Sequence, residues 1–275
     1  MTPDSITPVS TASIIAMVFT LLICIVVPIA ACIIAVLKWK GKSKITSFFI
    51  GVATFILFAM ILERILHAVV LGATGTLLTG NIWLYAIYGG LAAGLFEETG
   101  RFLAMKFCMK NTLNRENAIL YGIGHGGIEA ILIVGLTYVN NLIYSLLINS
   151  GSLSSVLSVY DADTQQTVLQ QLTVLGTTPS YLFYMAGMER INAMLLHVVL
   201  SYLVYLAVKN RKTGLYVLSI FLHALLDAGM ILLSGKLPLI LCEAILFAAV
   251  LLLAFVLYQY EKRHMKDDPN QITSI

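Results

Sequence analysis

The sequence is short of charged residues. Only 11% of its 275 residues are Asp, Glu, Lys or Arg, whereas a soluble globular domain carries about 25%. Hydrophobic residues make up 59% of the chain. A chain with so little charge cannot cover a water-exposed surface, so this composition excludes the soluble globular class. It predicts an integral membrane protein.

Usable thiol sites and repeats are also lacking. The four cysteines, Cys24, Cys32, Cys108 and Cys242, are scattered with no CxxC spacing, which excludes a disulfide framework and a thiolate zinc site. The HExxH signature of soluble zinc proteases is absent as well. Neither an internal repeat nor a soluble second domain is visible. We therefore expect residues 1–275 to form a single transmembrane domain.

Long apolar runs fill the chain, and about 20 apolar residues suffice to cross a bilayer. They predict an all-α fold, a polytopic transmembrane helical bundle of about seven spans. A bacterial cell membrane, crossed several times, is the expected location. The predicted spans cover residues 13–37, 46–72, 82–108, 118–148, 181–208, 214–234 and 237–258.

Basic residues predict the orientation of these spans. The segments "KWKGKSK", "KFCMKNTLNR", "KNRKTG" and "EKRHMKDD" all fall on one side when seven spans alternate. Because Lys and Arg are retained on the cytoplasmic side, we expect an extracytoplasmic N-terminus and a cytoplasmic C-terminus. The basic residues of these loops account for the net charge of +3, so this charge does not imply a nucleic-acid partner. The long loop at about 149–180 lies outside; its stretch 153–174 is either a surface helix or a polar connector.

Ionisable side chains interrupt the apolar spans at many points. An ionised group at the bilayer centre costs roughly 2.5–3.5 kcal/mol on insertion scales, so such residues usually mark function. Three of them, in "GLFEETGR", fall within five residues. The full set within the spans is Glu63, Arg64, His67, Glu97, Glu98, Arg101, His125, Glu129, Glu189, Arg190, His197, His223, Asp227 and Glu243.

Several of these residues lie at one depth. The depth of each residue follows from its distance along the helix from the basic end of its span, at about 1.5 Å per residue. This depth is roughly 11–17 Å for five residues on four spans: Glu98, His125, Glu129, His197 and His223. Two pairs, His125 with Glu129 and His223 with Asp227, are spaced i,i+4 and so share a helix face. Glycines in spans three and four, among them Gly94 and Gly122, predict that these two spans pack closely. The sequence thus predicts a polar layer shared by four helices.

Histidines with carboxylates and no usable thiol suit a divalent metal, most naturally Zn²⁺. A catalytic zinc takes about three protein ligands and a water. We expect His197 and His223 as ligands, completed by Glu129, Glu98 or Asp227, with a glutamate of span three as general base. Arg101 would pair with the other glutamate. Away from the layer, Glu63–Arg64 and Glu189–Arg190 are expected to be structural pairs.

The motifs "EETGR", "GHGGIEA", "MERINAMLLH" and "HALLD", in this order over residues 90–230, resemble the glutamate-type intramembrane protease superfamily. That group includes the CAAX prenyl endopeptidases and the PrsW proteases. The pattern is most similar to the YhfC branch, described as intramembrane metalloproteases. The first motif departs from the superfamily pattern, because two residues rather than three separate Glu98 from Arg101.

The resemblance implies specific roles. Glu97 and Glu98 match the paired glutamates, one of which activates the hydrolytic water. His125 or Glu129 occupies the second motif, His197 the third, and His223 with Asp227 the last. We therefore expect a catalytic set and a metal set in a peptidase that acts on a membrane-embedded or membrane-associated protein or peptide. The catalytic set is Glu97, Glu98, Arg101, His125 and Asp227, and the metal set is Glu129, His197 and His223.

Three alternatives stay open. A metal-free glutamate–histidine mechanism needs no zinc. An ion- or proton-coupled transporter would also place carboxylates and histidines within spans, although such transporters often show two similar halves. A non-catalytic immunity or scaffold protein could retain the same fold. Metal content and cleavage activity separate these alternatives.

Overall fold

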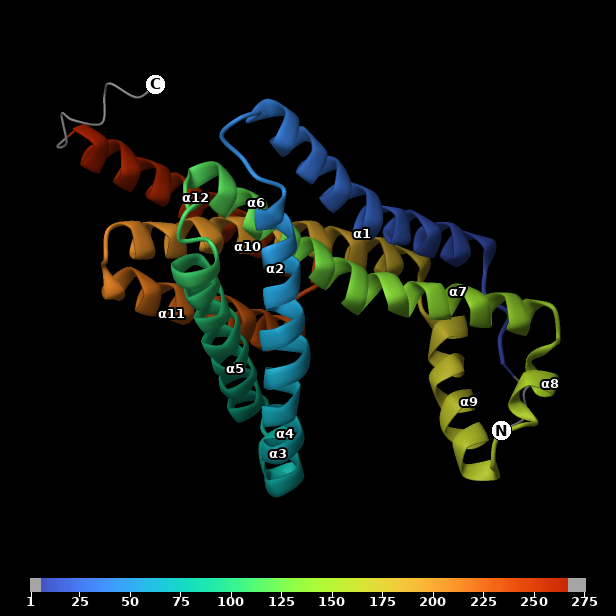
Figure 1. The fold of residues 1–275 in the computed structure, drawn as a ribbon. Helices are drawn as coiled ribbons and strands as arrows, with labels where there is room; N and C mark the ends of the chain where they lie inside the picture. Colours follow the sequence, from blue (N-terminus) through green and yellow to red (C-terminus); the bar gives the residue numbers. More distant parts are fainter. Residues whose placement is uncertain (1–5, 267–275) are drawn as a thin grey trace. The chain divides into compact units, whose positions relative to one another are not determined.

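All regular structure in the described residues, 6–266 of the computed structural model, is helical (Figure 1). The predicted all-α fold is confirmed. The described residues form twelve α-helices and three π-helical stretches, in which the backbone is wound more loosely. Their bounds are α1 (Thr11–Lys38), α2 (Thr46–Phe55), η2 (Ile56–Glu63), α3 (Arg64–Thr74), α4 (Thr76–Thr79), α5 (Ile82–Leu103), η3 (Ala104–Cys108), α6 (Arg115–Glu129), η4 (Ala130–Gly135), α7 (Leu136–Asn149), α8 (Leu153–Leu157), α9 (Ala162–Thr177), α10 (Ser180–Lys209), α11 (Thr213–Ser234) and α12 (Leu239–Lys266).

Six helical stretches in this part of the chain are long and apolar enough to cross a membrane. The chain is therefore a multi-pass membrane protein. The six stretches are Thr11–Lys38, Thr46–Thr74, Arg115–Asn149, Ser180–Lys209, Thr213–Ser234 and Leu239–Arg263. The 22-residue α5 is long enough but less apolar, since it carries Glu97, Glu98 and Arg101. With η3 it covers Ile82–Cys108, the third predicted span.

Each predicted span coincides with a helix or a run of helices, with ends that differ by a few residues. The second and fourth spans are continuous helices that change winding midway. Figure 1 shows α2, η2 and α3 as one continuous rod. The fourth span contains η4 directly after Glu129, and η2 ends at Glu63. Looser π-turns thus adjoin two of the buried carboxylates, as is frequent at functional sites.

The described residues divide into two compact units, whose boundaries fall inside α1, α6 and α10. One unit contains the chain up to Ala30 and Gly127–Ile191; the other contains Ala31–Gly126 and the chain from Asn192 onward. The expectation of a single domain stays a prediction.

The first unit is built around the loop that follows α7. Its core joins the start of α1 to α8 and α9 through buried residues such as Met17, Leu153 and Leu172. Asn149 ties the N-terminal segment down, because its side chain accepts a hydrogen bond from Val9 N and donates one to Val9 O, both at 2.8 Å. The stretch 153–174 consists of α8 and most of α9 with a break at 158–161, and both helices bury leucines such as Leu157 and Leu169 in this core.

The second unit holds most of the ionisable side chains. Small residues bring its helices together: a Cβ on Gly94 of α5 would lie 2.7 Å from Ile220 O of α11, so only glycine permits this contact. Gly100 of α5 packs in the same way on Phe58 of η2. The glycines of the third span thus meet α11 and η2, whereas the sequence had predicted contact with the fourth span.

All four cysteines are free thiols, as predicted, and three of them are buried.

Candidate metal centre

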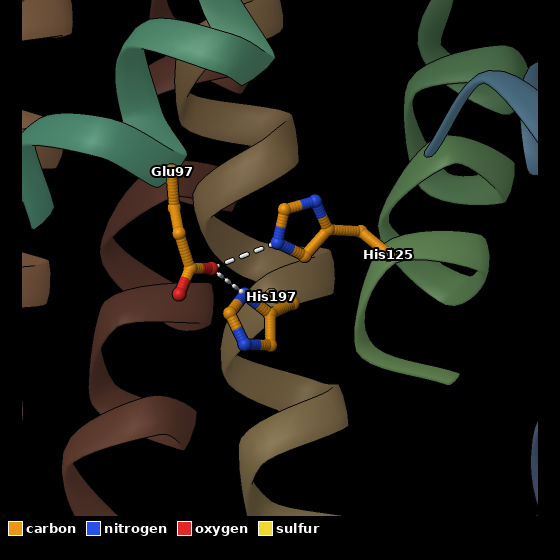
Figure 2. A group of neighbouring side chains, drawn as sticks. All are labelled: Glu97, His125 and His197. Carbon is orange, nitrogen blue, oxygen red and sulfur yellow. Dashed lines mark hydrogen bonds and ion pairs between the residues drawn. The ribbon is translucent and has the colours of Figure 1, made fainter. Parts of the chain in front are cut away.

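Three helices of the second unit bring a carboxylate and two imidazoles to one point. Figure 2 shows Glu97 reaching from α5 towards His125 of α6 and His197 of α10. The Oε2 atom of Glu97 lies 2.8 Å from His125 Nε2 and 3.7 Å from His197 Nδ1. One ligand atom from each residue lies within 4.8 Å of the other two, and all three residues are buried. Their spacing allows them to bind one metal ion together.

Glycines on α6 position the two histidines. Gly122 and Gly126 are spaced i,i+4 and face α10. A Cβ on Gly126 would lie 2.8 Å from Met194 Cα and 3.2 Å from His197 Cβ, and one on Gly122 would lie 2.7 Å from Val198 Cα. Small residues at this spacing let helix backbones approach closely in membranes. The "GIGHGG" run therefore places the rings of His125 and His197 only 4.8 Å apart, centroid to centroid.

A second set of charged side chains lies against this cluster. Arg101 donates from Nη1 to Glu98 Oε1 and from Nη2 to His197 Nδ1, the latter at 2.9 Å. His223 Nδ1 lies 2.8 Å from the same Glu98 oxygen, and its Nε2 lies 3.4 Å from Asp227 Oδ2. Arg101 and Glu98 are fully buried. Their ion pair offsets much of the cost of burying two charges.

Glu98 keeps one oxygen out of this network. Both Arg101 and His223 bind Oε1, and within the described chain the buried Oε2 has no hydrogen-bond partner. Buried polar atoms are nearly always hydrogen-bonded, so such an exception calls for a functional explanation. An ionised carboxylate oxygen in this position can accept a proton from a water molecule or a substrate.

The group that the structure brings together differs from the predicted metal set of Glu129, His197 and His223. Glu97 and His125, expected to be catalytic, join His197 in it. His223 contacts Glu98 and Asp227 instead. Glu129 belongs to the first unit, where its Oε1 accepts a hydrogen bond at 2.8 Å from Arg190, which also binds Glu189. Glu129 shares a helix face with His125, but this did not determine its partner, because Arg190 of its own unit binds it.

The remaining intramembrane groups form local pairs. The predicted pair of Glu189 with Arg190 is present. Glu63, expected to pair with Arg64, lies 3.2 Å from His67, whose other ring nitrogen lies 2.8 Å from Tyr88 Oη. Sequence reasoning missed the bond of Asn192 Nδ2 to Glu243 Oε2 at 2.8 Å, which joins α10 to α12. Its only signal was that Glu243 is the one ionisable residue within its predicted span.

The donor set fits zinc. Two imidazoles and one carboxylate are the protein ligands of several catalytic zinc sites, which keep a fourth position for water or substrate. One feature constrains the fit: Arg101 already donates to His197 Nδ1. Since one lone pair cannot serve both, ligation through that nitrogen requires Arg101 to release it. Glu98 would still hold the guanidinium through the Nη1 contact.

Comparison with known proteins agrees with the sequence resemblance. The family described as YhfC intramembrane metalloprotease matches residues 23–251. Over 198 residues the chain is 41% identical to a protein of Bacillus subtilis (strain 168) named "Uncharacterized membrane protein YhfC". This match covers 71% of the present chain and 76% of the relative. No solved structure matches.

Proposed function

The chain belongs to the YhfC family, and from this premise we propose that it is an intramembrane peptidase that hydrolyses a peptide bond in a membrane-associated substrate. The observation that carries the proposal is the buried group of Glu97, His125 and His197 beside the unpaired oxygen of Glu98. Hydrolysis needs an activated water and a polarised carbonyl, and these residues can supply both.

Glu97, His125 and His197 would hold the metal, with zinc the best match to the donor set. When bound there, zinc supplies a Lewis acid that polarises the scissile carbonyl and acidifies water. Close packing of α6 on α10 holds the rings of His125 and His197 side by side, and Glu97 reaches them from α5.

Glu98 is the general base in this proposal. Its Oε2 atom accepts a proton from the attacking water and later delivers it to the leaving amine. The positive charge of Arg101 favours the ionised form of Glu98. Because Arg101 binds the Oε1 atom of Glu98, the Oε2 atom is the one left to act as the base. His223, steadied by Asp227, binds the same Oε1 and so orients the carboxylate.

The substrate approaches from the bilayer in this proposal. An apolar groove of about 370 Å³ lies between α2–η2 and α5–η3, with Leu57 and Leu103 among its walls. Gly100 forms part of the same wall, and the next residue, Arg101, contacts His197 of the cluster. A groove with so few polar groups suits a lipid-facing entrance. The expected setting is the bacterial cell membrane, with the N-terminus outside.

N-terminal profiling tests the proposal. Membranes from cells that express the wild-type chain, E98Q or E63Q are compared for new protein N-termini, with expression levels matched. We expect cleavage products in the wild-type and E63Q samples and none with E98Q, because losing one member of a catalytic unit costs orders of magnitude in rate. Equal products from all three samples would contradict the assignment of Glu98.

A proton-coupled transporter remains the second candidate. One observation favours it: the buried chain from Arg101 through Glu98 and His223 ends at Asp227, whose side chain is 37% exposed. A carboxylate–histidine chain with an exposed end can conduct protons. Proteoliposomes that acidify under a membrane potential, without any peptide cleavage, would favour this candidate over the peptidase.

A further inference from the structure

A slot between α6, α10 and α12 has no part in the chemistry proposed above. Its cavity measures about 150 Å³, and its walls include Ile119, Val198, Ala254 and Leu257. The lining also includes Val199 and four polar or aromatic residues, Arg115, Glu261, Tyr202 and Tyr258. All of these residues belong to the second unit.

Polarity changes along the slot in the same direction on all three helices. On α6, Arg115 stands at the helix start and Ile119 one turn deeper. On α10, Tyr202 lies nearer the Lys209 end than Val198. On α12, Glu261 lies seven residues, about 10 Å, beyond Ala254. The cavity is therefore aliphatic inside and polar at the rim.

Further cations and tyrosines lie beyond the rim, starting with Tyr205, whose ring centre is 5.7 Å from that of Tyr202. The guanidinium of Arg115 lies 5.8 Å from the ring centre of Tyr202, and the ammonium of Lys209 lies 5.6 Å from that of Tyr205. Lys212 Nζ donates to Tyr260 Oη at 3.0 Å. Tyrosine rings with basic partners gather where hydrocarbon meets the headgroups of a bilayer. The rim thus lies at headgroup level, with the aliphatic part of the slot in the hydrocarbon.

We propose that this slot binds an anionic phospholipid of the surrounding bilayer, with one acyl chain between α6, α10 and α12 and the phosphate on Arg115. Charge complementarity selects this occupant, because the exposed charge in the lining is the cation: the Arg115 side chain is 51% exposed, whereas that of Glu261 is 11% exposed. A polypeptide is a poorer occupant, since aliphatic walls cannot satisfy its backbone hydrogen bonds.

Glu261 does not block the phosphate. Glu261 forms an ion pair with Arg115 Nη1 at 3.7 Å, which is longer than a hydrogen bond, and the Arg115 side chain is 51% exposed. A guanidinium carries five N–H donors in a fork that matches phosphate oxygens. Arg115 can therefore bind a phosphate while it stays near Glu261.

Native mass spectrometry of the full chain released from nanodiscs tests the proposal. The nanodiscs contain equal amounts of phosphatidylglycerol and phosphatidylcholine. We expect the wild-type protein to retain phosphatidylglycerol preferentially. Arg115→Gln should lower its retention about fivefold, the effect of one basic contact near the headgroups. Ala254→Phe and Val198→Phe, which fill the slot from two different helices, should abolish it.

Two matched controls make the result decisive. Lys236 also stacks on an aromatic ring, at 5.3 Å from the centre of Trp83, but it does not line the slot, so Lys236→Gln should retain the lipid. Ala248 lies on the exposed face of α12, so Ala248→Phe should behave like the wild type. Undiminished phosphatidylglycerol in both slot-filling variants, or equal losses in Lys236→Gln and Arg115→Gln, would overturn the proposal. Preference for phosphatidylcholine in the wild type would also overturn it.

Discussion

Arg101 joins the two halves of the candidate site: one arm of its guanidinium binds Glu98, and the other donates to His197 Nδ1 at 2.9 Å. This geometry explains why three charged residues within five are tolerated in a lipid-spanning helix. Glu98 and Arg101 neutralise each other, and Glu97 turns to the two histidines.

The first prediction concerns this ion pair. Arg101→Gln leaves the fully buried Glu98 without its cation, and breaking a buried pair costs about 3–5 kcal/mol. We expect a correspondingly large loss of stability in detergent, measured by equilibrium unfolding. The double variant E98Q/R101Q removes both charges and should recover most of the loss. Additive effects of the two single changes would show that the pair is not coupled.

The second prediction separates the ligand set of the structure from the one expected from sequence. Protein purified without chelator should contain about one zinc per chain, as for a single catalytic site. His125→Ala and His197→Ala should lose it. His223→Ala should keep it, because His223 contacts Glu98 and Asp227 and lies outside the three-residue group.

His67→Ala is the matched control for this measurement, since His67 is an intramembrane histidine whose contacts are Glu63 and Tyr88. It should retain wild-type zinc. Zinc lost in His223→Ala but kept in His125→Ala would restore the sequence-based set. Zinc absent from the wild type, with cleavage retained in chelator, would leave the metal-free mechanism.

The third prediction is the pH dependence of zinc affinity. A histidine must be neutral to bind a metal, and its ordinary pKa is about 6.5. Protonation therefore competes with zinc below that value, and affinity should fall as pH is lowered, by up to about a hundredfold per unit when two imidazoles are involved. Competition with a chromophoric chelator between pH 7.5 and 5.5 measures it. A flat profile would exclude histidine ligands.

Much of the fold could be predicted because the signals are local. Twenty-residue apolar runs specify spans regardless of partners, and α1 and α11 match their predicted bounds within a few residues. The polar layer followed from counting residues along helices, and Glu97, His125 and His197 do converge. A known rise per residue gives depth without knowledge of packing.

Partner choice could not be predicted, because it depends on helix rotation. Consecutive residues such as Glu97 and Glu98 point about 100° apart, and the sequence does not say which one faces α6. The pairing of Glu129 with Arg190 depends on residues 61 positions apart. The same holds for the glycine contacts. The sequence predicted that another helix packs closely on these glycines, but it did not identify which helix. The grouping of Glu97 with His125 and His197 therefore needed the structure, whereas the list of candidate residues did not.

The fourth prediction is the topology, which basic loops alone suggest. Reporters fused after residues 41, 112, 212 and 265 should give cytoplasmic signals, and one fused after residue 160 an extracytoplasmic signal, because Lys and Arg are retained inside. A phosphatase and a fluorescent protein at each site provide opposite readouts. A cytoplasmic signal at residue 160 would reverse the orientation and the expected side of the site.

The fifth prediction concerns the glycine that holds α6 against α10. A methyl group on Gly126 would meet Met194 Cα at 2.8 Å and His197 Cβ at 3.2 Å, so the two helices must separate. Since misplacement of a catalytic group by about 1 Å can cost a hundredfold in rate, Gly126→Ala should lose zinc and cleavage while still inserting into the membrane. Gly229 of α11 has open space around its Cβ position, so Gly229→Ala is the matched control and should retain both. Zinc content by elemental analysis and product formation by N-terminal profiling measure the two effects. Wild-type zinc in Gly126→Ala would mean that His197 does not depend on this contact for its position.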